Sequence, residues 1–207
     1  MPESRSPRDA SELTVDYRAH QSFDLKKDRK LNLAVQGVFL LVVVVALGAS
    51  LFLRLPIQTN WTPLFTVVVT LGACLLYMAL HEATHGGALW ALTRVKPSFA
   101  LRIPFLTTGN HAYLSRGKAV IVALWPVVIW GFVLVVALAV LPEDFRMTAY
   151  VLLTLNFAGS AGDFVEVCLV SRQPRNALIR DNGNTLNVFV PGAEQSLSPI
   201  ASTRTGH

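Results

Sequence analysis

The sequence has few charged residues and few cysteines. Only 15% of its 207 residues are charged and 52% are hydrophobic, which excludes an ordinary soluble domain and favours a membrane protein with several spans. The two cysteines, Cys74 and Cys168, both fall inside apolar stretches. On the topology argued below, their depths differ by roughly 20 Å at 1.5 Å per helical residue, so a disulfide between them is excluded.

Histidines and clustered basic residues are also scarce. The chain has five histidines, and those near the apolar stretches are too few for a membrane di-iron oxygenase. The basic residues form no groove-sized module with interleaved aromatic residues, so no nucleic-acid partner is predicted. The net charge of +5 therefore needs another explanation, which the arrangement of the apolar segments provides.

Four apolar segments are long enough to cross a hydrocarbon core of about 30 Å, which takes roughly 20 helical residues. They are Leu31–Leu53, Leu64–Trp90, Ala119–Leu141 and Met147–Val170. The first and third contain no charged residue, whereas the second and fourth do. The first segment is too long, and has too many polar residues before it, for a typical signal peptide, so we expect an uncleaved anchor.

Lysine and arginine lie mostly on one side of these segments. Sixteen of the eighteen precede the first segment, separate the second from the third, or follow the fourth; only Arg54 and Arg146 remain for the other side. Because basic residues stay on the cytoplasmic side of short loops, this pattern predicts a multi-pass protein of the cell membrane with both termini cytoplasmic. The lipid bilayer is a predicted partner, with anionic lipid beside the basic run at residues 26–30.

The chain divides into three predicted regions. Residues 1–30 are charged, poor in aromatic residues and without steady periodicity, so we expect a disordered cytosolic tail. Residues 191–207 are rich in Ser, Thr, Pro and Gly and are expected to form a second disordered cytosolic tail. Residues 31–190 would form one membrane-embedded domain.

Two segments outside the spans are predicted to be β-hairpins. The first comprises Phe99–Phe105, a turn at Thr107–Asn110 and then His111–Leu114, and is expected on the cytosolic side. The second joins Ala177–Arg180 to Leu186–Val190 through a turn rich in Asn and Gly. The predicted fold class is therefore an all-α integral membrane protein, with four transmembrane helices and a short cytosolic β-hairpin between helices two and three.

The second apolar segment contains His81-Glu82-Ala83-Thr84-His85, a His-Glu-x-x-His pattern. Positions i and i+4 of a helix lie on the same face, so His81 and His85 can offer two imidazoles to one zinc ion. Glu82 would stand beside the metal as a candidate general base. The other interpretation is a polar helix face packed on headgroups or another helix, but these residues are costly in an apolar span without a ligand.

The fourth segment carries two carboxylates, Asp163 and Glu166. A charged residue within a membrane helix costs roughly 3 kcal/mol on insertion scales, so it needs a reason to be there. Measured from the cytoplasmic ends of their spans, His81 and His85 lie at roughly 13 and 7 Å and Asp163 at about 10 Å. We therefore predict Asp163 as the third metal ligand. Glu166 is the alternative ligand, or a partner that orients a ligand imidazole, and Asp163 could instead form a hydrogen bond between helices.

Two imidazoles and one carboxylate, with a fourth position open to water, make a catalytic rather than a structural zinc site. Zinc lowers the pKa of water toward 7, and Glu82 can take its proton and later pass it to a leaving amine. Asn156 shares a helix face with Asp163 and is a candidate for orienting the substrate or supporting a ligand. A hydrogen bond that joins two helices is an equally good role for Asn156.

These motifs resemble a known family. The pattern His81-Glu82-x-x-His85, a following strand region and a later helix with Asn156-x-x-Gly159-Ser160-x-Gly162-Asp163 resemble the small membrane proteins described as putative zincin peptidases, related to site-2-protease-like intramembrane zinc metalloproteases. The resemblance covers roughly residues 64–190 and implies a zinc-dependent peptidase with the ligands and base named above. One departure is that Phe164 follows the ligand Asp163, where site-2 proteases have glycine, and no PDZ-like insert is present.

The sequence therefore predicts an integral membrane zinc metalloendopeptidase, with residues 31–190 as its metallopeptidase domain. It would hydrolyse peptide bonds of membrane protein or peptide substrates in the cytoplasmic half of the bilayer. One alternative is a catalytically inert membrane scaffold or metal-binding protein of the same fold. Another is a divalent-cation transporter, which usually needs polar residues along a path through the membrane. The substrate and the oligomeric state are left open.

Overall fold

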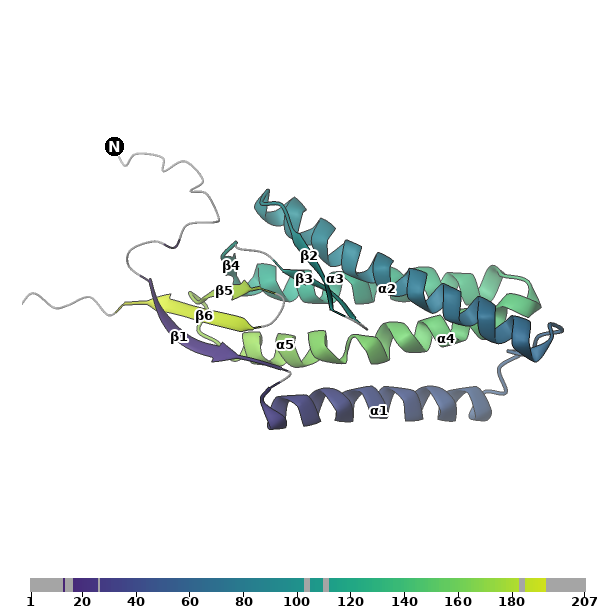
Figure 1. The fold of residues 1–207 in the computed structure, drawn as a ribbon. Helices are drawn as coiled ribbons and strands as arrows, with labels where there is room; N and C mark the ends of the chain where they lie inside the picture. The colour runs from purple at the N-terminus through teal and green to yellow at the C-terminus, as the bar shows by residue number, and fades with distance from the viewer. Residues whose placement is uncertain are drawn as a thin grey trace, which may run out of the picture.

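The computed structural model describes residues 13, 17–25, 27–102, 105–109, 112–182 and 185–192 of the chain. Figure 1 shows a helical bundle with a small sheet at one end. The helices are α1 (Arg29–Phe52), α2 (Pro63–Thr93), α3 (Arg116–Val140), α4 (Glu143–Gly159) and α5 (Ala161–Ser171). The strands are β1 (Tyr17–Phe23), β2 (Ser98–Arg102), β3 (Phe105–Gly109), β4 (Leu114–Ser115), β5 (Leu178–Asp181) and β6 (Leu186–Pro191).

Four helical segments in the described part of the chain are long and apolar enough to cross a membrane, which confirms the four predicted segments. Helix α1 begins after Asp28, whose carboxylate accepts hydrogen bonds from the backbone N–H groups of Lys30 and Leu31. Helix α2 begins after Thr62, whose hydroxyl accepts from the Phe65 N–H, with Pro63 in the first turn. Both starts satisfy backbone donors that the helix itself leaves unpaired.

The fourth segment, predicted as one helix over Met147–Val170, is divided. Helix α4 ends at Gly159 and α5 begins at Ala161, with Ser160 between them at φ −81° and ψ 13°. Adjacent glycine and serine are a common cause of helix kinks because both have low helix propensity. The break gives α5 its own N-terminus within the bundle.

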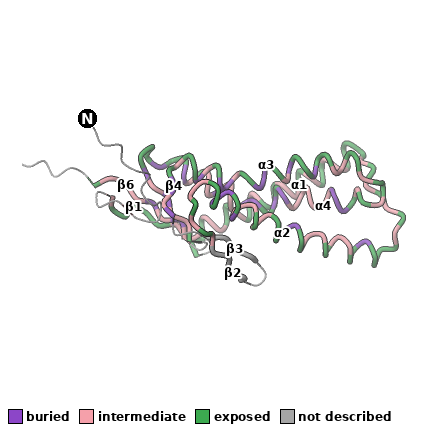
Figure 2. Tube along the Cα trace, turned by 90° about the horizontal axis from the view of Figure 1, so that it is seen from above, coloured by how far each residue is buried: buried purple, intermediate pink, exposed green. Residues whose placement is uncertain are grey.

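The helices pack around α3. Helix α3 lies against α2, α4 and α5, whereas α1 packs on α4 and α5 (Figure 1). Hydrogen bonds join neighbouring helices: the Thr70 and Thr148 hydroxyls are 2.9 Å apart, and the Tyr150 hydroxyl donates to the Ala46 carbonyl at 2.6 Å. The outward faces are exposed (Figure 2) and apolar, with Phe132 72% exposed. Apolar surface on this scale is typical of a lipid-facing or partner-facing protein.

The four-stranded sheet has the order β1-β6-β5-β4, with antiparallel pairing throughout. Strands β5 and β6 form the second predicted hairpin, which is confirmed. Ile179 and Val188 from this hairpin are fully buried against Leu89 of α2 and Val170 of α5. The sheet therefore closes one end of the bundle with its own apolar core, so the all-α fold class was incomplete.

Strand β1 lies within residues 1–30, the predicted disordered tail, and corrects the expectation of disorder for Tyr17–Phe23. Residues 1–12, 14–16 and 26 lie outside the described residues. Tyr17–Phe23 pairs antiparallel with β6, and the side chain of Ser22 donates to Asn187 Oδ1 at 2.9 Å. Most β1 side chains are exposed, so the strand is held mainly by its backbone hydrogen bonds. Only the two end residues, Tyr17 and Phe23, are partly buried, and the five residues between them are exposed. The strand therefore shows no alternation of apolar and polar residues in the sequence. Residues 193–207, within the second predicted tail, lie outside the described residues.

Strands β2 and β3 form a hairpin between α2 and α3, but their bounds differ from the predicted ones; residues 103, 104, 110 and 111 of the predicted hairpin lie outside the described residues. Strand β2 pairs with β3 so that Arg102 lies opposite Phe105 and Ser98 opposite Gly109. The predicted turn at Thr107–Asn110 is therefore wrong, since Thr107–Gly109 belongs to β3. Two adjacent β-branched residues, Thr107 and Thr108, favour a strand over a turn.

Candidate metal centre

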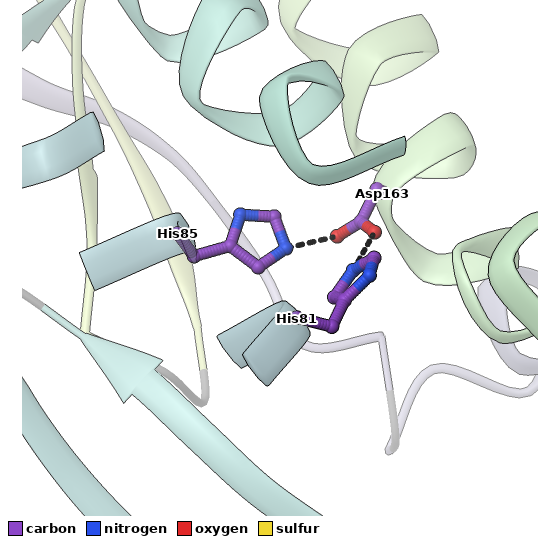
Figure 3. A group of neighbouring side chains, drawn as sticks. All are labelled: His81, His85 and Asp163. Carbon is purple, nitrogen blue, oxygen red and sulfur yellow. Dashed lines mark ion pairs between the residues drawn. The ribbon is translucent and has the colours of Figure 1, made fainter. Parts of the chain in front are cut away.

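Helices α2 and α5 bring three predicted ligands together. His81 Nε2 lies 3.7 Å from one carboxylate oxygen of Asp163, and His85 Nε2 lies 3.6 Å from the other (Figure 3). One donor atom from each of the three residues lies within 4.8 Å of the other two. The side chains are 12%, 12% and 22% exposed respectively. This convergence agrees with the depth comparison made from the sequence.

Local structure positions each of these side chains. His81 and His85 are one turn apart on α2, so both point to the same side of the helix. Asp163 lies in the first turn of α5, where the positive end of the helix dipole favours a carboxylate. The division of the fourth segment at Ser160 therefore places a helix N-terminus beside the ligand carboxylate.

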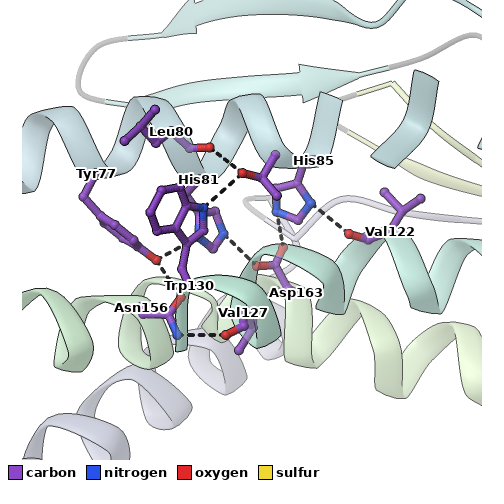
Figure 4. Close-up of polar contacts among 10 residues, drawn as sticks. Tyr77, Leu80, His81, His85, Val122, Val127, Trp130, Asn156 and Asp163 are labelled. Atoms are coloured by element: carbon purple, nitrogen blue, oxygen red, sulfur yellow. Dashed lines mark hydrogen bonds and ion pairs between the residues drawn. The ribbon is translucent and has the colours of Figure 1, made fainter. Parts of the chain in front are cut away.

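The hydrogen bond of His85 determines which of its nitrogens can bind a metal. His85 Nδ1 lies 3.0 Å from the backbone carbonyl oxygen of Val122 on α3 (Figure 4). A carbonyl oxygen only accepts, so Nδ1 carries the hydrogen. In the neutral imidazole, Nε2 then has a lone pair, and this is the atom that faces Asp163.

His81 is oriented in the same sense through two further residues. Asn156 Nδ2 donates to the Val127 carbonyl at 3.1 Å, which turns Asn156 Oδ1 toward α2 (Figure 4). Tyr77 donates its hydroxyl hydrogen to Asn156 Oδ1 at 2.7 Å. Because a phenol has one hydrogen, its oxygen can only accept from His81 Nδ1, 2.9 Å away. In the neutral imidazole, His81 Nε2 then has a lone pair, and this atom faces Asp163.

This arrangement fits a divalent cation. Two lone-pair nitrogens facing a carboxylate repel it unless a positive charge lies between them. The two N–O separations, 3.7 and 3.6 Å, exceed the roughly 2.7–2.9 Å of a charge-assisted hydrogen bond. They are close to the about 3.4 Å that separates two ligands of a tetrahedral zinc ion with bonds of about 2.0–2.1 Å. Outer hydrogen bonds on both imidazoles are also typical of zinc ligands.

The two glutamates predicted near the metal, Glu82 and Glu166, differ in their position relative to the three-residue cluster. Glu82 follows His81 on α2 and lines the same cavity as His81 and Asp163. Glu166 is one turn further along α5 than Asp163, but it does not belong to the three-residue cluster found among the described residues. The geometry thus favours Asp163 over Glu166 as third ligand, and Glu166 retains only a supporting place.

Sequence reasoning missed Tyr77. The available signal was its position four residues before His81, which places the two side chains on one helix face. Trp130 was also missed as a site residue: its indole N–H donates to the Thr84 hydroxyl at 3.0 Å, and Thr84 donates to the Leu80 carbonyl. These contacts fix α2 against α3 at the level of the motif. Asn156 joins helices through its bonds to Tyr77 of α2 and to the Val127 carbonyl of α3, and its role toward a substrate or a ligand stays a prediction.

Comparison with known proteins adds one finding. A family model with the description "Putative zincin peptidase" matches residues 74–178, just over half of the chain. The matched range includes the motif on α2 and the ligand-bearing turn of α5, and it extends to the first residue of β5. No curated protein and no solved structure matches the chain.

Proposed function

The chain belongs to the putative zincin peptidase family, and we propose that it is an integral membrane zinc metallopeptidase of the site-2-protease-like kind. The observation that carries the proposal is the convergence of two imidazole nitrogens and one carboxylate, with Glu82 on the lining of the same cavity. His81, His85 and Asp163 would hold zinc, and Glu82 would act as general base. The substrate would be a membrane-associated protein or peptide.

The chain's residues divide the chemistry among them. Zinc, when bound, supplies a Lewis acid that polarises the peptide carbonyl and makes water more acidic. Glu82 takes a proton from the attacking water and passes it to the nitrogen of the leaving amine as the C–N bond breaks. Val122 and Tyr77 hold the two imidazoles in the orientation that leaves Nε2 available. Asn156 holds Tyr77.

Three features support activity within the bilayer. Four helical segments are long and apolar enough to span it, and the helices expose large apolar side chains along their length. The distribution of sixteen of eighteen basic residues favours both termini in the cytoplasm. With that orientation, the cluster would lie in the cytoplasmic half of the membrane.

The test is to compare the parent with Glu82→Gln on a fluorophore-labelled transmembrane peptide in proteoliposomes. We expect cleavage to fall by about 10²–10⁴-fold, as loss of a general base does, with zinc content unchanged. The matched control is Glu143→Gln, because the Glu143 side chain is 75% exposed at the start of α4. Equal cleavage by parent and Glu82→Gln would remove the general-base assignment. Absence of cleavage by the parent would favour an inert scaffold.

A further inference from the structure

Two backbone carbonyls of α3 hold the polar network around the metal ligands. The Val122 carbonyl lies 3.0 Å from the imidazole of His85, and the Val127 carbonyl accepts from a side-chain amide of α4 at 3.1 Å (Figure 4). A helix normally pairs each carbonyl with the N–H group four residues later. Four residues after these two carbonyls stand Pro126 and Gly131. Each of them makes its carbonyl more accessible to a side chain, for a different reason.

Pro126 removes the helical partner of the Val122 carbonyl. Proline has no backbone N–H, and inside a helix its ring clashes with the carbonyl four residues earlier and tilts it off the helix axis. Pro126 lies inside α3 and is less than 2% exposed. A carbonyl that loses its helical donor in apolar surroundings needs another one, because an unpaired backbone group is costly within a bilayer. His85 Nδ1, at 3.0 Å, is in the position to supply it.

Gly131 gives Asn156 access to the Val127 carbonyl. A Cβ added at Gly131 would lie 3.3 Å from Asn156 Nδ2, closer than an ordinary van der Waals contact. Asn156 is fully buried, so it could retreat from that Cβ only by straining its bond to Val127. Because Asn156 Oδ1 accepts from Tyr77, and the Tyr77 oxygen accepts from His81, the missing side chain at position 131 acts on the second imidazole.

We propose that Pro126 and Gly131 are positioning residues for the two ligand imidazoles. Pro126 removes the backbone donor that would compete with His85 Nδ1, and so keeps His85 Nε2 free for the metal. Gly131 makes the space in which the side chains that orient His81 are held. The inference rests on the proposed function for the presence of a metal, but its tests measure zinc affinity and imidazole tautomers and do not need peptide cleavage.

The first experiment separates the missing N–H of Pro126 from the shape of its ring. It compares the full parent chain with Pro126→Ala and with a chain that carries lactic acid at position 126, incorporated by nonsense suppression. Alanine and lactic acid have the same side chain, but lactic acid supplies an ester oxygen in place of the backbone N–H. Zinc affinity is measured in detergent by competition with a chelator.

We expect Pro126→Ala to bind zinc about tenfold more weakly, the lower end of the range for outer hydrogen-bond partners, because the regained N–H competes for the Val122 carbonyl. The ester chain should bind zinc nearly as tightly as the parent. If Pro126 only shaped α3, the ester chain would bind no better than Pro126→Ala, because it lacks the helical hydrogen bond that alanine regains. Parental affinity in Pro126→Ala, or equal losses in both chains, would overturn the role of Pro126.

The second experiment reads the tautomer of His85 by ¹⁵N NMR of histidine-labelled protein. It uses the Asp163→Ala background, which removes the metal and the carboxylate that would hold a hydrogen on Nε2. We expect the His85 hydrogen on Nδ1, and a mixture of both tautomers once Pro126→Ala is added. The same single tautomer with and without Pro126→Ala would overturn the role of Pro126, even if the parent cleaves peptides. The expected change in a parent that cleaves nothing would leave the inference and remove the peptidase assignment.

The third experiment tests Gly131 by a double-mutant cycle. We expect Gly131→Ala to lower zinc affinity by about tenfold, whereas Gly117→Ala on the same helix, where an added Cβ meets nothing within 4 Å, should match the parent. In the Tyr77→Phe background, Gly131→Ala should cause little further loss, because both changes break the same chain of hydrogen bonds. Parental affinity in Gly131→Ala, or an equal further loss in the Tyr77→Phe background, would overturn the role of Gly131.

Discussion

Helices α1 and α2 are both long, apolar and of spanning length, at 24 and 31 residues, yet they do different work. No residue of α1 is buried, and its Ala46 carbonyl accepts a hydrogen bond from the Tyr150 hydroxyl of α4. Helix α2 is linked to α3 and α4 by hydrogen bonds through Tyr77, Thr84 and His85. Apolar length therefore indicates a span, whereas polar side chains on one face indicate where the chemistry lies.

Removing a ligand from α2 should have the largest effect. We expect His85→Ala to abolish peptide cleavage and to weaken zinc binding by more than about a hundredfold, since even outer hydrogen-bond partners account for about 10–100-fold. Leu40→Ala on α1, a residue that is 61% exposed, is the comparison. It should leave cleavage and zinc affinity at the parental value. Similar losses of cleavage and zinc affinity in His85→Ala and Leu40→Ala would contradict the claim that α2, and not α1, carries the metal ligands.

The hydroxyl of Tyr77 should have the next largest effect. Tyr77→Phe removes the acceptor that holds His81 Nδ1, and we expect zinc affinity to fall by about 10–100-fold in a chelator competition. Tyr150→Phe is the control: it removes a tyrosine hydroxyl that donates to the Ala46 carbonyl and so joins α4 to α1. Its zinc affinity should stay within about twofold of the parent, because mutations outside the ligand network usually have small effects. Equal affinity of Tyr77→Phe and the parent would refute the orienting role of Tyr77.

A smaller effect is expected at the contact between α3 and the motif helix. Trp130→Phe keeps an aromatic ring but removes the N–H that donates to Thr84. We expect the free energy of unfolding in detergent to fall by about 0.5–1.5 kcal/mol, the usual net value of one hydrogen bond. Trp125→Phe, at a position that is 48% exposed on the same helix, serves as control. A loss of stability in the control as large as in Trp130→Phe would mean that ring size, not the hydrogen bond, is responsible.

The spans and the ligand cluster could be predicted because their signals are local. Apolar length identifies a helix that can cross a membrane, and the spacing of His81 and His85 puts them on one face. Asp163 required only a comparison of depths between two spans. The role of Tyr77 could not be predicted in this way, because it depends on Asn156, which is 79 residues away.

The sheet was partly predictable for a similar reason. The hairpin of β5 and β6 alternates buried and more exposed residues, and that periodicity is visible in the sequence. Strand β1 has no such pattern, because backbone pairing holds it to a strand about 170 residues later in the chain. Periodicity within a short segment cannot reveal a partner at that distance in the sequence. The helix break at Ser160 had a signal, the adjacent Gly159, but its consequence for Asp163 required the three-dimensional arrangement.

The most direct test of the account is metal analysis of the purified full chain after exposure to zinc and removal of the excess. We predict one zinc ion per chain in the parent and in Glu166→Gln, and none in Asp163→Ala. Stoichiometric zinc in Asp163→Ala, or its loss in Glu166→Gln alone, would contradict the claim that α2 and α5 hold one cation through His81, His85 and Asp163.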